Sequence, residues 1–258
     1  MSVYFTSDQH ITLQFPERGR RFARFLDRLD PRADRLVIAG DLCDFWFTAR
    51  EARLAPARHE PGLLALKSFL GRGGDVTLMA GNHDQHLEWF YRDFLGLSFT
   101  PEPLEESFEG LRVRLAHGHL LGGRSEWKGW MESRLFLSTF EKVPSLVANS
   151  LAAQLKKYNS RNKKVDNLRH FLVYKHYVQS LSQASCDTVV LGHVHQTIFR
   201  DIDVPGLPSP LKLAVLGHWF HQSSWLKVDS GYAEFYICQD DKPEPCPALP
   251  AQICGPGE

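Results

Sequence analysis

Paired cysteines and long apolar runs are both missing from this sequence. The five cysteines stand at Cys43, Cys186, Cys238, Cys246 and Cys254, without a C-x-x-C pair. An odd, dispersed count is typical of reduced thiols in a cytosolic protein. The first residues lack the basic and apolar segments of a signal peptide, and no apolar run reaches the roughly 18–20 residues of a bilayer-spanning helix. We therefore expect a cytoplasmic protein that is either soluble or peripheral on a membrane without crossing it.

The chain also has no excess of charge of one sign, because 30 Lys and Arg balance 30 Asp and Glu. This balance argues against a protein that grips nucleic acid through overall charge. A hydrophobic content of 43% is ordinary for a globular protein, which excludes disorder, collagen and small disulfide scaffolds. Histidine, in contrast, is abundant, with twelve residues against three Met.

Short β-rich segments recur, and each ends in polar residues. They are Val3–Ser7, Arg35–Ala39, Val76–Ala80, Leu111–Ala116, Thr188–Leu191, Lys212–Leu216, Trp225–Val228 and Tyr232–Cys238. Helical patterns separate the first three: an i, i+3, i+4, i+7 spacing runs from Phe22 to Leu29, and a second pattern ends at Gly71. The later segments follow one another as in a meander. We predict a layered α/β domain with a central mixed sheet.

Residues 124–176 differ from the rest of the chain. They contain helical patterns broken by Pro144, with eleven Lys and Arg against four Asp and Glu, so the segment is +7 and the remainder −7. Its basic excess suits an anionic partner such as a membrane surface. Alternatively, Trp127, Trp130 and Met131 pack against the main domain or another subunit, which leaves the oligomeric state open. Prolines in residues 240–258 predict a poorly ordered tail.

Five short motifs rich in Asp and His each follow a predicted strand. They are Asp8-Gln-His10, Gly40-Asp41-Leu-Cys-Asp44, Gly81-Asn82-His83-Asp84, His117-Gly-His119 and Gly192-His193-Val-His195. Each alone has an ordinary interpretation as a turn, cap or surface loop. Because strand ends in an α/β sheet converge on one crevice, five such motifs together predict a shared site. Carboxylate and imidazole together suit Mn, Fe and Zn, whereas Ca and Mg prefer oxygen ligands alone.

These blocks, in this order and over nearly the whole chain, resemble those of the calcineurin-like metallophosphoesterases. The resemblance implies an α/β (α+β) fold of four layers, a two-sheet β-sandwich flanked by helices, with two divalent metals about 3.5–4 Å apart. We expect Mn, with Fe or Zn as alternatives. Asp41 would bridge the metals. The remaining ligands would be Asp8, His10 and His195 on one metal and Asn82, His117 and His193 on the other.

The family's reaction implies roles for these and neighbouring residues. The two cations would offset the repulsion between Asp8 and Asp41, and the solvent that bridges them would attack phosphorus in line. His83 would donate a hydrogen bond or proton near the leaving group and would be oriented by Asp84. Asn82 and His193 would also contact the substrate.

A finer resemblance is to the UDP-2,3-diacylglucosamine hydrolases, the pyrophosphatases of lipid A synthesis. It lies in Gly40-Asp-Leu-Cys-Asp-Phe-Trp46 and in Val215-Leu-Gly-His-Trp219 with the strand after it. It implies a catalytic core at 1–123 and 177–239 and a helical lid at 124–176. Ser160 and Lys164 of that lid would contact the substrate, a lipid-linked UDP-sugar. Its pyrophosphate would be cleaved to UMP and a lipid sugar 1-phosphate.

Three positions depart from that subgroup. His83 stands where Arg is typical, His119 stands where Asp is usual, and an expected acid near Ser125 has only Glu126 as its neighbour. His83 favours an alternative within the same class, a soluble metal-dependent phosphodiesterase or phosphomonoesterase acting on a non-lipid substrate. A second alternative is a metallophosphoesterase fold used only as a protein-binding scaffold. Such a scaffold usually has eroded ligands, and all seven expected ligand residues are present here.

Overall fold

Two mixed β-sheets form the centre of the molecule. The computed structural model describes residues 1–13, 15–44, 60–84, 87–100, 102–122, 139, 142–143, 167–183, 185–239 and 242–246. The larger sheet has the order β12-β11-β10-β1-β2-β3-β4. Its strands are β1 (Ser2–Thr6), β2 (Asp34–Ile38), β3 (Asp75–Met79), β4 (Ser98–Thr100), β10 (Ser223–Asp229), β11 (Tyr232–Gln239) and β12 (Lys242–Cys246). Strands β1 to β4 are parallel, and β10, β11 and β12 pair antiparallel with their neighbours.

The second sheet has the order β5-β6-β7-β9-β8. Its strands are β5 (Leu104–Phe108), β6 (Leu111–Ala116), β7 (Thr188–Leu191), β8 (Ile198–Ile202) and β9 (Leu211–Val215). The three inner strands β6, β7 and β9 are parallel, whereas the edge strands β5 and β8 are antiparallel to their neighbours. Both sheets therefore contribute parallel strands whose carboxyl ends can carry the loops of one site.

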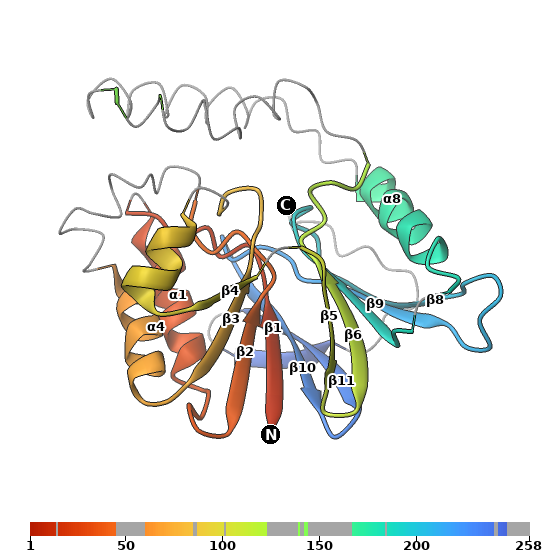
Figure 1. Cartoon of the computed structure of the whole chain (residues 1–258), viewed down its shortest axis with the longest axis horizontal. Coiled ribbons are helices and arrows are strands. Elements are labelled where there is room, and N and C mark those ends of the chain that lie inside the picture. Colours follow the sequence, from red (N-terminus) through yellow and green to blue (C-terminus); the bar gives the residue numbers. More distant parts are fainter. Residues whose placement is uncertain are drawn as a thin grey trace.

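Helices cover the outer faces of the two sheets (Figure 1). Helix α1 (Pro16–Leu26), helix α4 (Pro61–Gly71) and the π-helical turn η1 (Phe90–Leu95) pack on the larger sheet, and helix α8 (Asn167–Gln179) packs on the smaller one. Between the sheets lies a core of inward-facing side chains. They include Val3, Phe5, Val37 and Met79 from the larger sheet and Val113, Leu115, Val190 and Ala214 from the smaller one. The described residues thus form four layers in the order helix, sheet, sheet, helix.

The alternation of side chains along each strand explains how the larger sheet packs against the helices on one face and against the smaller sheet on the other. In β2, Leu36 and Ile38 face the helices and Val37 faces the other sheet, because successive side chains of a strand point to opposite faces. An apolar run with both faces buried is typical of the parallel strands of α/β proteins. No helix within the described residues combines the length and the apolar character needed to cross a bilayer.

The eight strands expected from the sequence are confirmed within two residues as β1, β2, β3, β6, β7, β9, β10 and β11. The strand pattern alone predicted one central mixed sheet, which is wrong, because these strands divide between two sheets; the two-sheet sandwich implied by the family resemblance is confirmed. The apolar pattern identifies a strand but not its partner. Four strands were not expected: β4, with only three residues, β5, which contains two adjacent glutamates, β8 and β12.

Regular elements occur in the expected C-terminal tail and across the expected end of the lid segment. Residues 242–246, within the expected Pro-rich tail, form β12 and pair with β11. Pro243 and Pro245 are compatible with this position, since β12 is an edge strand and an edge strand tolerates proline where its N–H would face solvent. Helix α8 crosses residue 176, the expected end of the lid segment, and packs on the smaller sheet. Of residues 124–166, only 139 and 142–143 are among the described ones.

Helices α1 and α4 cross closely because α1 has a glycine at the contact. A side chain at Gly19 would collide with Glu60 Oε1. Glu60 is the N-cap of α4, and its carboxylate accepts the backbone N–H of Leu63 at 2.9 Å. The residue is only 2% exposed. Burial raises the pKa of Glu60 from 4.5 to about 7.

Glu60→Gln should make the stability of the chain less dependent on pH. Between pH 4.5 and pH 7 the native state holds a proton on Glu60 that the unfolded state has lost, so this residue lowers stability as pH rises. The full effect is about 3 kcal/mol. Glutamine keeps the cap acceptor without the charge. The difference in unfolding free energy, variant minus wild type, should therefore grow by this amount between pH 4.5 and pH 8 in urea titrations. A difference that does not change with pH would contradict the assignment.

Candidate metal centre

The five Asp- and His-rich motifs meet at the carboxyl ends of β1, β2, β3, β6 and β7. Within the described residues, three groups of side chains place their ligand atoms within 4.8 Å of one another. They are Asp8, His10 and His195; Asp41, His117 and His193; and His10, Asp41 and His83. Asp41 belongs to two of the groups. Its Oδ2 is also 3.8 Å from His10 Nε2 of the first group, so this carboxylate lies between the two ends of the site.

The first cluster brings one carboxylate oxygen and two imidazole nitrogens together. Asp8 Oδ1 lies 3.5 Å from His10 Nε2 and 3.4 Å from His195 Nε2, and the two nitrogens are 3.1 Å apart. Asp8 Oδ2 accepts hydrogen bonds from the Ser7 hydroxyl and, at 2.9 Å, from the His193 N–H. Asp8 Oδ1 is buried and has no hydrogen-bond partner among the described residues. A buried oxygen left without a partner beside two imidazoles fits a divalent cation.

The second cluster has a defined histidine tautomer. His117 Nδ1 lies 2.8 Å from the carbonyl oxygen of Ala39, so we assign its proton to Nδ1. Nε2 then carries a lone pair and faces Asp41 Oδ2 at 3.3 Å and Asn82 Oδ1 at 3.2 Å. Three acceptors in this arrangement repel one another unless a proton or a cation lies among them. His193, whose ring centre is 5.3 Å from that of His117, completes the cluster.

The charges of the two carboxylates depend on these imidazoles. Burial opposes the ionisation of Asp8 and Asp41, but the imidazoles beside them outweigh burial and hold both pKa values well below the usual range. Burial lowers the pKa of His10, and that of His193 far more. For His117 the attraction of Asp41 outweighs burial and raises the pKa to about 10. Ionised Asp8 and Asp41 and neutral His10 and His193 are thus already in the protonation states that metal binding requires, whereas His117 holds a second proton at neutral pH that a bound cation would displace.

The backbone of the site is strained. Left-handed φ values occur at Asp8 (57°), His10 (46°), Asp41 (57°), His193 (68°) and His195 (59°). Glu109 and Ser230 are the only other non-glycine residues with positive φ in the part of the chain that the structure describes. Such conformations cost on the order of 1–3 kcal/mol each and persist where surrounding contacts hold them. Backbone bonds between neighbouring loops supply part of this support, from Asp8 N to Gly40 O and from His10 N to Asp41 O.

The buried carboxylate of Asp84 stabilises the loop after β2, which contains Asp41. Its Oδ2 accepts the N–H of Asp41 at 2.5 Å and that of Gly81 at 3.0 Å, and its Oδ1 accepts the Tyr91 hydroxyl at 2.7 Å. Burial, followed by repulsion from Asp41, raises the pKa of Asp84 to about 6. These contacts fix the backbone of Asp41, whose carboxylate lies between the two clusters. Orientation of His83 by Asp84 stays a prediction.

The side chain of His83 lies between two other carboxylates. Nε2 is 3.8 Å from Asp41 Oδ2, and Nδ1 is 3.8 Å from Asp44 Oδ1. Asp44 is held in turn by Arg18, which also donates to the carbonyl oxygen of His10. No role for Asp44 was predicted from the sequence, although the Gly-Asp-x-x-Asp spacing of the second motif places a second carboxylate in the same loop as Asp41.

Two expected substrate contacts fall outside the described part of the chain, whereas His119, which had no predicted role, lies beside the second cluster. Ser160 and Lys164 lie outside the described residues. His119, which departs from the expected pattern of the fourth motif, is 8% exposed and places Nδ1 3.2 Å from Glu102 Oε2. Its ring centre is 5.6 Å from that of His117, so it borders the second cluster.

Adjacent clusters of buried His and Asp with a carboxylate between them, at the strand ends of an α/β sandwich, define a metal-dependent hydrolase. The family model for the calcineurin-like phosphoesterases matches residues 1–197. The chain belongs to this family of metal-dependent phosphoesterases, and a divalent-metal site is typical of its members.

Several named proteins are similar to this chain. UDP-2,3-diacylglucosamine hydrolase of Pseudomonas paraeruginosa is 28% identical over 237 residues, which cover 89% of this chain and 96% of that protein. The enzyme of the same name from Aeromonas hydrophila is 27% identical over 239 residues, covering 88% and 94%. Among solved structures, a conserved protein of Streptococcus pneumoniae described as a predicted phosphoesterase aligns over 96% of this chain and 94% of its own, with a TM-score of 0.45 and 13% identity.

Asp41→Asn should impair metal binding at both clusters, because it removes the negative charge that lies between them. We expect isothermal titration with Mn²⁺ to show fewer than two bound ions per chain. Turnover of bis(4-nitrophenyl) phosphate should fall by more than about 100-fold. Asp201→Asn, at an exposed aspartate paired with Lys212, is the matched control and should behave as wild type. An active Asp41→Asn protein with two tightly bound ions would refute the shared site.

Proposed function

We propose that this chain is a dimetal phosphohydrolase that cleaves the pyrophosphate of a lipid-bearing UDP-sugar, similar to UDP-2,3-diacylglucosamine, to UMP and a lipid sugar 1-phosphate. The position of Asp41 between two His/Asp clusters is the observation that carries the hydrolytic part. The substrate is supported by the names of relatives that match the chain over nearly their whole length. We propose Mn²⁺ as the metal, with Fe or Zn as substitutes, since all three accept these ligands.

Each residue of the site has a proposed task. Asp8, His10, Asp41 and His195 would hold one cation, and Asp41, Asn82, His117 and His193 the other. Two bound cations would polarise the phosphoryl group and lower the pKa of a water molecule between them. Asn82 presents Oδ1 to His117, and we propose that its amide nitrogen donates to a phosphoryl oxygen. His193 is proposed as a further substrate contact.

His83 is proposed to act at the leaving group. Its side chain is 24% exposed, against 5% for His10 and 0% for His117, so it borders the solvent side of the site. Asp44 and Asp41 lie on either side of its ring and restrict its orientation. A donor held in this way can neutralise the charge that develops on the departing phosphate oxygen.

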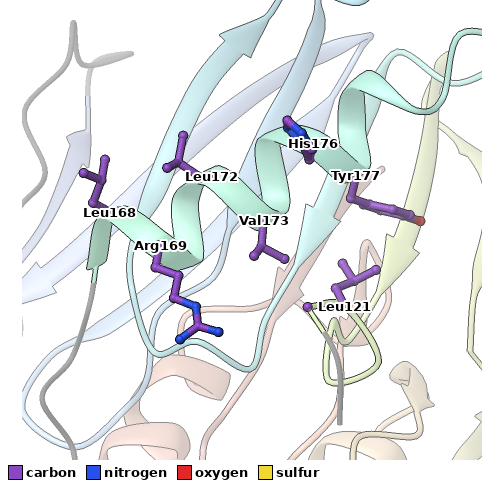
Figure 2. A pocket seen from close by; sticks show the side chains of 8 residues that line it. Leu121, Leu168, Arg169, Leu172, Val173, His176 and Tyr177 are labelled. Atoms are coloured by element: carbon purple, nitrogen blue, oxygen red, sulfur yellow. The ribbon is translucent and has the colours of Figure 1, made fainter.

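A pocket beside α8 supports a lipid-bearing substrate. It has a volume of about 790 Å³ and is lined by Leu121, Gly122, Leu168, Arg169, Leu172, Val173, His176 and Tyr177. Figure 2 shows Val173 and Tyr177 pointing toward Leu121, which follows the His117-Gly-His119 motif. Leu168 and Leu172 are 56% and 49% exposed. Apolar walls with one guanidinium suit an acyl chain attached to an anionic head group.

A substrate with two acyl chains resides in a membrane, so we propose peripheral contact with the inner face of the cytoplasmic membrane. Ser160 and Lys164, in the segment 124–176, are proposed to contact the substrate on the strength of the family resemblance alone. The basic excess of that segment is consistent with an anionic surface.

The purified protein, loaded with Mn²⁺, should release UMP from UDP-2,3-diacylglucosamine in detergent micelles. UDP-N-acetylglucosamine, which has the same pyrophosphate but no long acyl chains, should be a poor substrate by a factor of more than about 100, because it leaves the apolar pocket empty. Release of nucleotide is followed by chromatography. Hydrolysis of small soluble esters without any UMP release from the lipid would favour the alternative, a soluble phosphodiesterase or phosphomonoesterase, to which His83 in place of Arg points.

His83→Ala should separate the donor role from a ligand role. We expect kcat to fall about 100-fold or more, the usual contribution of a positioned acid, while two Mn²⁺ ions still bind. His221→Ala, at an exposed histidine near the site, should retain wild-type kcat. Loss of one bound ion in His83→Ala would instead make His83 a metal ligand, as its grouping with His10 and Asp41 allows.

A further inference from the structure

Tyr174 is a buried residue of α8 that reaches two loops of the metal centre. It is 1% exposed, and its hydroxyl donates to the carbonyl oxygen of Gly192 at 2.9 Å. A Cβ atom on Gly118 would lie 2.5 Å from the same hydroxyl, and Gly118 has φ of 99°. Gly192 immediately precedes His193, and Gly118 immediately follows His117. The hydroxyl is therefore positioned between the loop after β6 and the loop after β7.

The peptide group that joins Gly192 to His193 is held at both of its polar atoms. Its carbonyl oxygen accepts the Tyr174 hydroxyl, and its N–H donates to Asp8 Oδ2 at 2.9 Å. The same carbonyl also accepts the N–H of Val194 at 2.8 Å, which closes a three-residue turn with His193 at its centre. His193 has φ of 68° in this turn. Turns of this kind are rare and strained, so they depend on contacts from outside the turn.

The orientation of this peptide also determines how Asp8 is presented. Asp8 Oδ2 accepts the Ser7 hydroxyl and the His193 N–H, which leaves Oδ1 facing the imidazoles of His10 and His195. A rotation of the peptide would remove a donor from Oδ2 and move the His193 ring at the same time. One hydroxyl from outside the five motifs thus supports a residue of each cluster.

We propose that Tyr174 is a positioning residue of the metal centre: its hydroxyl fixes the Gly192–His193 peptide and, through it, His193 and Asp8. This inference rests on the two-cation site of the proposed function. Burial, with Asp8 and Glu102 nearby, raises the pKa of Tyr174 well above its usual range, so the hydroxyl keeps its proton and remains a donor. Because Val173 and Tyr177 of the same helix line the pocket, Tyr174 connects the pocket wall to the metal ligands.

Tyr174→Phe tests this role, since phenylalanine keeps the buried ring and removes only the hydroxyl. We expect the dissociation constant of at least one Mn²⁺ ion to rise about tenfold in isothermal titration, the size typical of a lost contact behind a metal ligand. With bis(4-nitrophenyl) phosphate, the Mn²⁺ concentration that gives half-maximal turnover should rise by a similar factor. Gln179→Ala is the matched control, because it removes a different hydrogen bond of α8, the exposed one to Asp203 O in the loop after β8. It should bind Mn²⁺ as wild type does.

The outcomes distinguish this inference from the proposed function. A Tyr174→Phe protein that binds both ions with wild-type affinity would overturn the positioning role, whereas a wild-type chain that binds no Mn²⁺ would overturn the two-cation site itself. Hydrogen exchange on the wild-type chain gives a second readout that needs no variant to fold. Added Mn²⁺ should slow exchange at the amides of His193 and Val194 and in α8 around Tyr174. Protection of the loop without any change in α8 would contradict the proposal.

Discussion

The mutual repulsion of buried acceptors is the constraint on which the rest of this structure depends. Asp8 and Asp41 are enclosed at the strand ends together with imidazole nitrogens and the amide oxygen of Asn82, and Asp8 Oδ1 is buried without a hydrogen-bond partner among the described residues. In a medium of low polarity such a cluster of acceptors is unfavourable unless it also contains a positive charge. Divalent cations would supply that charge compactly and would convert the destabilising cluster into a site for anionic phosphate.

The sandwich makes this concentration of acceptors possible, because each sheet supplies part of it. The larger sheet carries Asp8, His10, Asp41 and Asn82 after β1, β2 and β3, and the smaller sheet carries His117, His193 and His195 after β6 and β7. The loops that carry these residues are strained, and hydrogen bonds from other side chains hold their backbone in place. The Asp84 carboxylate accepts the N–H of Asp41, and Arg18 donates to the carbonyl oxygen of His10. The Tyr174 hydroxyl donates to the carbonyl oxygen of the peptide before His193. Stability of the fold and geometry of the site therefore share the same hydrogen bonds.

The sequence predicted the strands and the convergence of the motifs well, because both follow from local pattern. Apolar alternation marks segments such as β2, and polar residues just after them must lie at one edge of a parallel sheet. The pattern does not determine which strands pair, since the division into two sheets depends on contacts between distant strands; only the family resemblance implied the two-sheet sandwich. The same limit applies to Asp84 and Tyr174: a pattern places Asp84 near His83 but cannot reveal that its oxygens accept N–H groups of Asp41 and Gly81.

Asp41 is proposed to be shared by two divalent cations. Anomalous diffraction at the manganese edge, from crystals of the Mn²⁺-loaded protein, tests it most directly. We expect two peaks about 3.5–4 Å apart with the Asp41 carboxylate between them. Asp8, His10 and His195 should lie around one peak, and Asn82, His117 and His193 around the other. A single peak, or two peaks that do not share Asp41, would contradict it.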